Sequence, residues 1–275
     1  MMAPESMNQQ RAPRNSMRRA STVFVAVAAL GAALTLGACG DDSSSSSASS
    51  SVSSTPSAET SASSTSTSAS VAAVPTVSAS ELVLPEGDFP QVSGGKFSLE
   101  AGADNDNDDD VAVDKPECRD LVASSHEDER GVDQAERELE LPQTNGTSPS
   151  YKAKVKKRID PDYTENFDRI LAACGSFTLT VRDDGRDIPV RMTMERLSPA
   201  GVDGAFNGVR MVGTFTQSGT EISLVQHLLL GVDRGTSFQV SYDITSTGGS
   251  TVAADVERNL VQMFNAQRTR ITAAN

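Results

Sequence analysis

Two histidines and three cysteines are the side chains of this 275-residue chain best suited to chemistry. His126 lies in the sequence SSHEDER, which lacks the second histidine of a His-Glu-x-x-His zinc site. His227 alternates with Gln226 and Leu228, as a side chain on one face of a strand does. Each histidine is interpreted as a surface or sheet-face residue, with a ligand or base as the alternative. Because the sequence has no Gly-x-Ser-x-Gly, Walker or Gly-x-Gly-x-x-Gly motif, we assign no catalytic and no cofactor-binding residue.

The first 38 residues have the layout of an export signal. Four arginines precede residues 21–38, which are apolar or small and carry no charge. A helix of about 18 residues is roughly 27 Å long, so a permanent transmembrane anchor is an alternative. However, Gly40, two aspartates and a serine run follow this segment, where a stop-transfer helix usually has positive charge.

The tetrapeptide Leu36-Gly37-Ala38-Cys39 resembles the lipobox of bacterial lipoproteins. In that class the signal is cut before the cysteine, which carries a diacylglyceryl thioether and often an N-linked acyl chain such as palmitate. Two or three acyl chains anchor a protein stably, whereas one does not. The resemblance implies a signal peptide over residues 1–38 and lipidation of Cys39. An ordinary signal peptide with an incidental cysteine is the alternative.

Residues 39–80 are predicted to be the lipidated cysteine followed by a disordered tether. The stretch 41–80 is mainly Ser, Thr and Ala and has no aromatic residue. It cannot bury enough apolar surface to offset the entropy lost on ordering. A flexible coil of about 40 residues has a root-mean-square length of about 35 Å. We therefore expect the rest of the chain to lie on the extracytoplasmic face of the cell membrane, in the cell envelope.

Residues 81–275 are predicted to form one α+β domain. Apolar and polar residues alternate in five segments between 176 and 244, which predicts strands with one buried face. Glycine-containing turns separate them at 183–186, 217–220 and 233–236. Such short connections force antiparallel pairing, so we expect a β-meander of about five to six strands. The fourth segment is apolar on both faces, which predicts a central place or one under a helix.

A C-terminal helix over 251–270 is predicted to cover one face of this sheet. Its apolar residues recur at helical spacing: Val252, Val256, Leu260, Met263 and Phe264. Ser250 or Thr251 is the expected N-cap. Upstream, we expect the acidic stretch 125–150 to be a loop with at most a helical turn, and Tyr151–Ile159 to be an edge strand protected by its lysines.

Cys118 and Cys174 are predicted to lie on two short helices that begin near Asp114 and Asp160. With Cys39 acylated, they are an even pair in a compartment where disulfides persist. We expect a structural disulfide that closes a loop of about 57 residues and contributes about 4 kcal/mol. A redox-active or metal-binding pair is the alternative, although such cysteines usually lie close together in the sequence.

The charge pattern limits the partners of the chain. The formal net charge of −13 excludes nucleic acid as a partner of an exported protein. An EF-hand loop starting at Asp104 would need glycine at 109 and glutamate at 115, where Asp109 and Lys115 stand. The acidic run 104–110 is therefore either a solvated loop or a loose calcium site, and we assign no metal ligand. The basic cluster 152–158 either protects a strand edge or meets anionic lipid heads or wall polymers.

The order of these motifs resembles that of actinobacterial cell-envelope lipoproteins. The resemblance is carried by the lipobox, the Ser/Thr tether, LVLPEGDFP at 82–90, PEC at 116–118, and ILAACGSFTL at 170–179. Within this class of lipoproteins, the order of motifs is similar to that of proteins with a sensor-like domain. That domain is related to the extracellular domain of receptor serine/threonine kinases. That family implies an antiparallel sheet, a helix–helix disulfide and a cleft for a small ligand. Its usual second disulfide and tryptophan are absent from this chain, so no family site residue is transferred.

Three functions remain for the folded part. The first is a ligand-binding or sensor-like module that holds a small or lipidic ligand between sheet and helices. Met192, Met194 and Met211 would line such a pocket or belong to the core. The second is a scaffold or assembly lipoprotein that binds another envelope protein through its sheet edge or its 198–205 loop. The third, an enzyme acting on wall material, would need a carboxylate pair or a histidine in a cleft. We expect the first function and no enzymatic activity.

Overall fold

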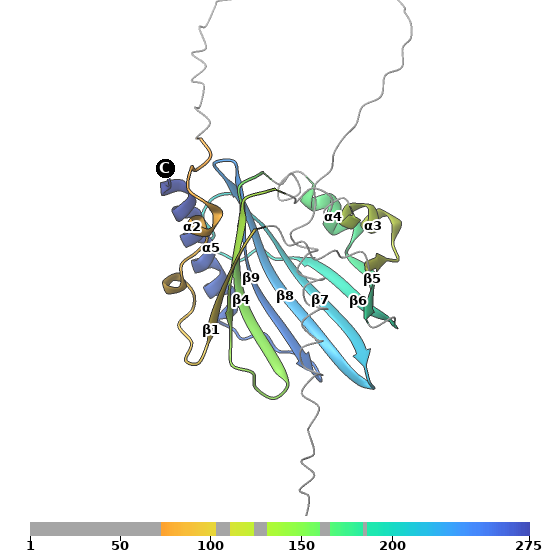
Figure 1. Ribbon diagram of the computed structural model, residues 1–275. Helices are drawn as coiled ribbons and strands as arrows, with labels where there is room; N and C mark the ends of the chain where they lie inside the picture. The colour runs from red at the N-terminus through yellow and green to blue at the C-terminus, as the bar shows by residue number, and fades with distance from the viewer. Residues whose placement is uncertain (1–72, 103–110, 124–130, 160–165, 184–185) are drawn as a thin grey trace, which may run out of the picture.

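The computed structural model describes residues 73–102, 111–123, 131–159, 166–183 and 186–275. Within these ranges the chain forms one nine-stranded antiparallel sheet with helices packed on both faces (Figure 1). Cys39, the tether up to residue 72, the acidic run 104–110 and His126 lie outside the described residues. None of the helices in the described ranges is long and apolar enough to cross a membrane.

The helices and strands follow one another along the chain in an irregular order. The helical elements are α2 (Ala79–Leu82), the 3₁₀ turn η1 (Glu86–Asp88), α3 (Pro116–Ala123), α4 (Phe167–Ala173) and α5 (Val256–Ala273). The strands are β1 (Lys96–Ala101), β2 (Val111–Val113), β3 (Gln134–Glu140), β4 (Thr147–Lys156), β5 (Ser176–Asp183), β6 (Arg186–Arg196), β7 (Asn207–Gln217), β8 (Thr220–Asp233) and β9 (Thr236–Thr247). The spatial order of the strands is β1-β3-β4-β9-β8-β7-β6-β5-β2.

The predicted five-stranded meander is confirmed as β5 to β9, which are consecutive neighbours in the sheet. Two of its turns have two central residues with positive φ, Ser218-Gly219 and Arg234-Gly235. Such turns match the twist of the strands that they join. The predicted number of five to six strands was too low, because four further strands extend the meander. These are β4, β3 and β1 on one side and β2 on the other.

Strands β3 and β4 correct two predictions. The acidic stretch 125–150 contains β3 rather than a loop, and β4 lies between β3 and β9 rather than at an edge. The lysines of β4 therefore protect no edge. Lys152 lies opposite Glu138 and Lys154 opposite Glu136, so the charged face of one strand is matched by that of the other.

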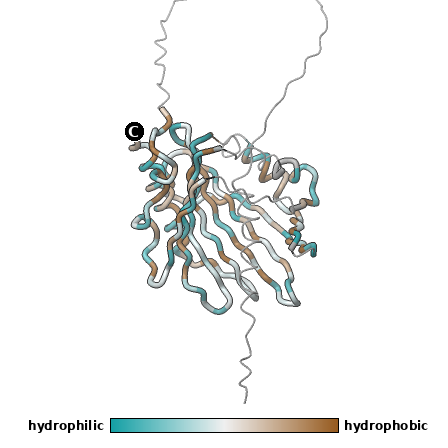
Figure 2. Tube along the Cα trace, viewed as in Figure 1, coloured by the Kyte–Doolittle hydropathy of each residue, from teal (hydrophilic) through white to brown (hydrophobic). Residues whose placement is uncertain are grey.

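Each face of the sheet carries its own hydrophobic core. In β8, Leu224 and Leu228 belong to the first core, and Val225 and Leu229 to the second, because successive side chains point to opposite faces. The first core lies between β5–β8 and the helices α3 and α4, and the second between β3, β4, β8, β9 and the helices α2 and α5. Strand β8 is the fourth segment of the predicted meander, and its expected central place in the sheet is confirmed. Apolar residues are accordingly frequent along the middle strands (Figure 2).

Helix α5 covers the second core, as predicted, but it begins at Val256 with Asp255 as N-cap. Ser250, Thr251 and Val252 lie before it, because Gly248 and Gly249 adopt positive φ and carry the chain out of the sheet first. The other expected positions, Val256, Leu260, Met263 and Phe264, are buried.

The first described segment, residues 73–84, is attached to the C-terminal helix α5 by hydrogen bonds. The side chain of Gln267, fully buried in α5, accepts a hydrogen bond from the Leu84 amide at 2.7 Å and donates one to the Leu82 carbonyl at 2.9 Å. The Thr76 amide also donates to the carbonyl of Asn275, at 2.7 Å. Helix α2 begins at Ala79, two residues before the predicted domain start at 81.

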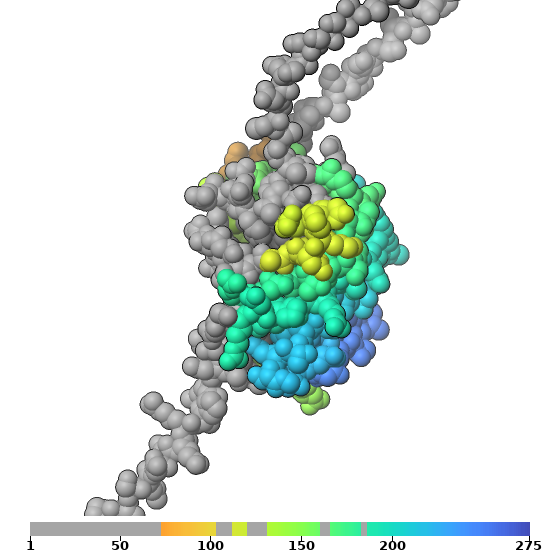
Figure 3. Space-filling model, turned by 90° about the vertical axis from the view of Figure 1, so that its right-hand side faces the viewer, coloured from red at the N-terminus to blue at the C-terminus, as the bar shows by residue number. Residues whose placement is uncertain are grey.

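The two short helices are joined by the Cys118–Cys174 disulfide. Cys118 lies in α3 and Cys174 directly follows α4, and both sulfurs are buried in the first core. Helix α3 lies on the surface, in contact with α4 and β2 (yellow and green in Figure 3). The disulfide therefore fastens the helices that cover the β2–β5 edge of the sheet.

A candidate ligand groove between sheet and terminal helix

His227 is the one candidate histidine among the described residues, and it lies within the sheet. It is 6% exposed, and its cross-strand neighbours are Arg210 and Tyr242. Burial, and secondly the charge of Arg210, lower its pKa to about 4. Neither ring nitrogen has a hydrogen-bond partner in the described structure. At neutral pH this side chain is a neutral imidazole packed between neighbouring strands.

The methionines do not form the suggested pocket. Met192 and Met211 are buried in the first core and Met194 packs against it, so they belong to the core under α3 and α4. The described residues also contain no group of three His, Cys, Asp or Glu side chains that could hold a metal ion. The 198–205 loop is held against α5, where the Asp203 amide donates to Asn265 Oδ1 at 2.8 Å.

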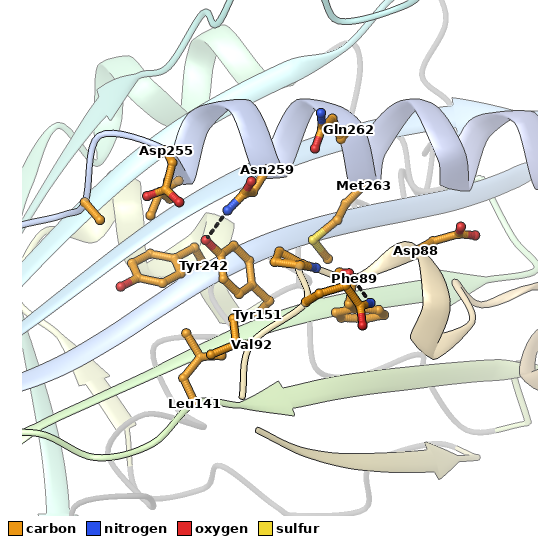
Figure 4. A pocket seen from close by; sticks show the side chains of 14 residues that line it. Asp88, Phe89, Val92, Leu141, Tyr151, Tyr242, Asp255, Asn259, Gln262 and Met263 are labelled. Carbon is orange, nitrogen blue, oxygen red and sulfur yellow. Dashed lines mark hydrogen bonds between the residues drawn. The ribbon is translucent and has the colours of Figure 1, made fainter. Parts of the chain in front are cut away.

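A groove of about 460 Å³ opens between the sheet and α5, on the face of the second core (Figure 4). Its floor is formed by Tyr151 of β4 and Tyr242 of β9, and one wall by the N-terminal half of α5. The segment after η1 forms the opposite wall. The lining residues are Asp88, Phe89, Pro90, Gln91, Val92, Leu141, Tyr151, Tyr242, Ala253, Asp255, Val256, Asn259, Gln262 and Met263.

The wall opposite α5 is shaped by the sequence LVLPEGDFP. Leu82, Val83 and Leu84 are buried in the second core, and Phe89 returns into that core with only 3% exposure. Between these anchors, η1 bulges outward with no buried side chain. The ring of Phe89 also packs edge-on against Phe97 of β1, at 5.4 Å between ring centroids. The wall is therefore attached at both ends and keeps the groove open between them.

The two tyrosines provide the polar floor. Their ring centroids are 4.9 Å apart, and the hydroxyl of Tyr151 accepts a hydrogen bond from Asn259 Nδ2 at 3.0 Å. No described residue forms a hydrogen bond with the hydroxyl of Tyr242. Burial raises the pKa of Tyr151, although the hydrogen bond from Asn259 opposes this change. Burial, and then the neighbouring Tyr151 and Asp255, raise the pKa of Tyr242 to about 12. Both phenols therefore stay protonated at neutral pH and can donate hydrogen bonds.

The groove has a negative electrostatic character. Asp88 and Asp255 line it, and none of the described lining residues is a lysine, an arginine or a histidine. Arg258 lies outside the lining and reaches Asp255 at 3.9 Å in an exposed ion pair, which is a weak interaction. The rest of the lining is mixed: Phe89, Val92, Leu141, Val256 and Met263 are apolar, whereas Gln91, Asn259 and Gln262 carry neutral polar amides. The groove thus combines apolar side chains, neutral amides, two phenol hydrogen-bond donors and two carboxylates.

A buried polar cluster lies on the opposite face of β9. Because Asp243 follows Tyr242 in the strand, its side chain points away from the groove. Its carboxylate accepts hydrogen bonds from Gln226 Nε2 at 2.6 Å and from Ser241 Oγ at 3.1 Å. Burial raises the pKa of Asp243 to about 6, even though the charge of Lys152 opposes this change. Burial alone would lower the pKa of Lys152, but Asp243 and the two β3 glutamates together raise it.

This cluster predicts an unusual pH dependence of stability. The folded Asp243 carboxyl holds its proton more tightly than the unfolded one, whose pKa is near 3.8. Its contribution to stability is complete below about pH 4 and is lost as the pH rises through about 6. We expect Asp243→Asn to remove this loss, of about 3 kcal/mol, from urea unfolding curves recorded between about pH 4 and 7.

The exposed Asp187 provides the matched control for that measurement, since its side chain is 61% exposed. Asp187→Asn should leave the pH dependence of the wild-type protein unchanged. Equal pH dependence in Asp243→Asn and the wild-type protein would mean that Asp243 is not buried in the folded chain.

No protein-family model matches this sequence, and no curated protein matches it significantly. Solved structures that align with it include an uncharacterised protein of Mycobacterium smegmatis, the Rv0999 ortholog. That alignment has 11% identity and a TM-score of 0.39, and it covers 66% of this chain and 92% of the other.

A second aligned structure is LpqN of Mycobacterium tuberculosis, which is described as involved in cell envelope biogenesis. Here the identity is 13% and the TM-score 0.24, over 68% of this chain and 86% of the other. Likenesses this distant show no family for the chain. They also do not show the expected relation to receptor-kinase extracellular domains, which stays a prediction.

Local sequence patterns nominate none of the groove residues as ligand contacts. The patterns indicate only strand positions for Tyr151 and Tyr242 and helix positions for Asp255 and Asn259. A usable signal was present, because the chain has only three tyrosines and two of them lie in neighbouring strands. That β4 and β9 pair, however, is a contact between residues about 90 positions apart, which no local pattern reveals.

Proposed function

We propose that this protein is a lipid-anchored, extracytoplasmic binding module of the cell envelope, whose groove holds a small ligand with an apolar body and a neutral or cationic polar group. The observation that carries the proposal is the groove between sheet and α5, whose lining places apolar side chains beside two phenol donors, three side-chain amides and two carboxylates. Small-molecule sites typically combine mostly apolar walls with a few polar groups that orient the ligand. The anchor and the location rest on the N-terminal sequence.

The charge of the lining favours neutral or cationic ligands. An anion in the groove would lie near Asp88 or Asp255 without a cationic side chain in the described lining to compensate its charge. Burying a charge without a partner is strongly unfavourable. A hydroxyl, amide or ester of the ligand, in contrast, could accept a hydrogen bond from Tyr242 or Tyr151. An ammonium group could lie beside Asp255 or over a tyrosine ring.

The protonation states favour binding over catalysis. Burial raises the pKa of both groove tyrosines, so neither is a nucleophile or a general base at neutral pH. Asp88 and Asp255 have no histidine, lysine or cysteine beside them in the described lining that could act with them. His227, which could act as a base, does not line the groove. We therefore propose a non-catalytic module.

A dye-displacement assay tests this function. Residues 40–275, exported behind a cleavable signal that has no lipobox, lack both the apolar segment and the acylated cysteine and so need no detergent. This chain would be titrated with Nile red, an uncharged apolar dye. Decylammonium and decanoate would then compete with the dye, because they share a chain length and differ in charge. We expect saturable dye binding and displacement by decylammonium at concentrations about tenfold lower than by decanoate. Absence of saturable binding, or displacement by decanoate first, would contradict the proposal. Native mass spectrometry of the purified protein would reveal a ligand that co-purifies.

Two tyrosine variants separate binding from folding. Tyr242→Phe removes a hydroxyl without a described protein partner, so we expect little change in stability and about fivefold weaker binding of a ligand that accepts its hydrogen bond. Tyr151→Phe removes the acceptor of Asn259 Nδ2 and should lower the free energy of unfolding by about 1 kcal/mol. Decanol, titrated against Nile red, supplies the accepting hydroxyl, and urea unfolding measures stability. Unchanged decanol binding in both variants would show that the tyrosines do not contact the ligand.

A further inference from the structure

Among the described residues, strand β1 is an edge strand of the sheet. In the described structure it pairs with β3 alone, and all six of its residues are exposed. Two of them are large apolar residues, Phe97 at 37% and Leu99 at 47% exposure. The other edge strand, β2, has only three residues. An exposed edge with apolar side chains is a template for pairing with another strand.

The backbone groups that face the open side belong to Phe97 and Leu99. The amide of Gly102 donates to the carbonyl of Gln134 in β3, at 3.0 Å. Backbone groups of an antiparallel strand point alternately to its two neighbours. The even-numbered residues of β1 therefore bond to β3, and the amides and carbonyls of Phe97 and Leu99 are directed outward.

We propose that β1 pairs with β1 of a second copy of this chain, in antiparallel register about a two-fold axis at Ser98. In this register Phe97 lies opposite Leu99 of the second copy, and each such pair exchanges two backbone hydrogen bonds. Both residues have outward-directed backbone groups, as that pairing requires. The contact is isologous, because the same strand serves both copies, and it joins the two sheets into one.

The side chains of β1 are self-complementary in this register. Lys96 lies opposite Glu100 of the second copy, and the two-fold axis repeats this pair. These are non-hydrogen-bonded positions, where side chains approach most closely and opposite charges stabilise the pairing. On the other face, Phe97 and Leu99 of both copies form one continuous apolar strip.

Neighbouring registers lose this match. A shift of the axis to Phe97 places Lys96 opposite Ser98 and Glu100 opposite Gly94. A shift to Leu99 places Glu100 opposite Ser98 and Lys96 opposite Gly102. Shifts of half a residue bring inward-directed backbone groups opposite outward-directed ones, and no ladder forms. The register at Ser98 is therefore the one in which charge, apolar side chains and backbone groups all agree.

Cysteine crosslinking of the full chain tests both the contact and its register. Ser98→Cys would place two thiols opposite each other with Cα atoms about 4.5 Å apart, within the range that a disulfide spans. Ala101→Cys, in the same exposed strand, would place its thiols about 20 Å apart. After mild oxidation in cells, we expect a covalent dimer on non-reducing gels for Ser98→Cys, and no more dimer for Ala101→Cys than for the wild-type chain.

Charge reversal tests the complementarity. In the Ser98→Cys background, Lys96→Glu and Glu100→Lys should each reduce the yield of dimer roughly tenfold, because each brings like charges together twice. Co-expression of the two variants, distinguished by tags, should restore crosslinking between them, since every pair is then of opposite charge. The control Arg182→Glu changes the charge by the same amount at an exposed residue of β5. It should leave the yield of dimer unchanged.

Each outcome bears on the proposal. No dimer with Ser98→Cys, equal dimer with Ala101→Cys, or no rescue on co-expression would overturn it. An unchanged thermal midpoint of each variant confirms that the chain is folded, which we expect since all altered residues are exposed. The crosslinking and the charge-reversal results do not depend on ligand binding in the groove.

Discussion

Replacing Phe264 with alanine should lower the free energy of unfolding by about 4 kcal/mol. Phe264 is fully buried at the centre of the contact between α5 and the sheet. Its ring packs on Phe238 at 4.9 Å between centroids and on Phe206 at 6.2 Å. The truncation would remove these contacts and leave a cavity that the rigid sheet cannot close. Urea unfolding of the purified chain measures the change.

Gly231 explains why the residues around Phe264 cannot fill the cavity that Phe264→Ala would leave. A Cβ atom at this position of β8 would lie 2.7 Å from the ring of Phe264 and 2.5 Å from that of Phe238. The glycine thus makes the room that the two rings fill, and a smaller residue at 264 leaves that room empty. Ile159→Ala is the control, because Ile159 is 51% exposed and its truncation should cost less than about 1.5 kcal/mol. Equal costs for the two variants would show that α5 is not packed on the sheet.

Removing the Cys118–Cys174 disulfide should have a similarly large effect. The bond joins residues that are 56 positions apart, and a loop of this length is expected to contribute about 4 kcal/mol by restricting the unfolded chain. Cys118→Ala with Cys174→Ala should lower the free energy of unfolding by that amount. Alanine is chosen because a serine hydroxyl would be buried at these positions, which are 0% and 1% exposed.

Reduction provides an independent measurement. Dithiothreitol should destabilise the wild-type chain to about the level of the double variant and should not change the double variant further. If the wild-type protein unfolds at the same urea concentration with and without reductant, the cysteines are not joined in the folded protein. After reduction, the amide hydrogens of α3 and α4, which the bond fastens over the first core, should exchange faster than they do with the bond intact.

Local patterns are sufficient where the spacing of apolar residues shows which faces of a strand or helix are buried. The meander β5 to β9, the two-faced burial of β8 and the apolar face of α5 all follow from spacings of two or of three to four residues. The glycine turns placed the hairpins because they need positive φ. The pairing of Cys118 with Cys174 followed from counting the cysteines outside the proposed lipid anchor.

The charged strands could not be recognised in this way. In β3, Gln134, Glu136 and Glu138 alternate with only two buried apolar residues, so the segment resembles a solvated loop. Its glutamates become favourable in a strand only because the lysines of β4 lie opposite them. The predicted start of α5, at residue 251, was too early for a related reason. The path of residues 248–255 depends on where β9 ends within the sheet.

Taken alone, the amino-acid order of this protein determined which segments are strands of a meander, which helix covers them and which two sulfurs join, because each depends on periodicity or counting along the chain. Only the tertiary structure decided that β3 and β4 continue the sheet beyond β9, that Tyr151 comes to lie beside Tyr242, and that β1 is left as an edge. These features depend on contacts between residues far apart in the chain. Their stability comes from matched charges and packed rings on different strands, which no single segment carries.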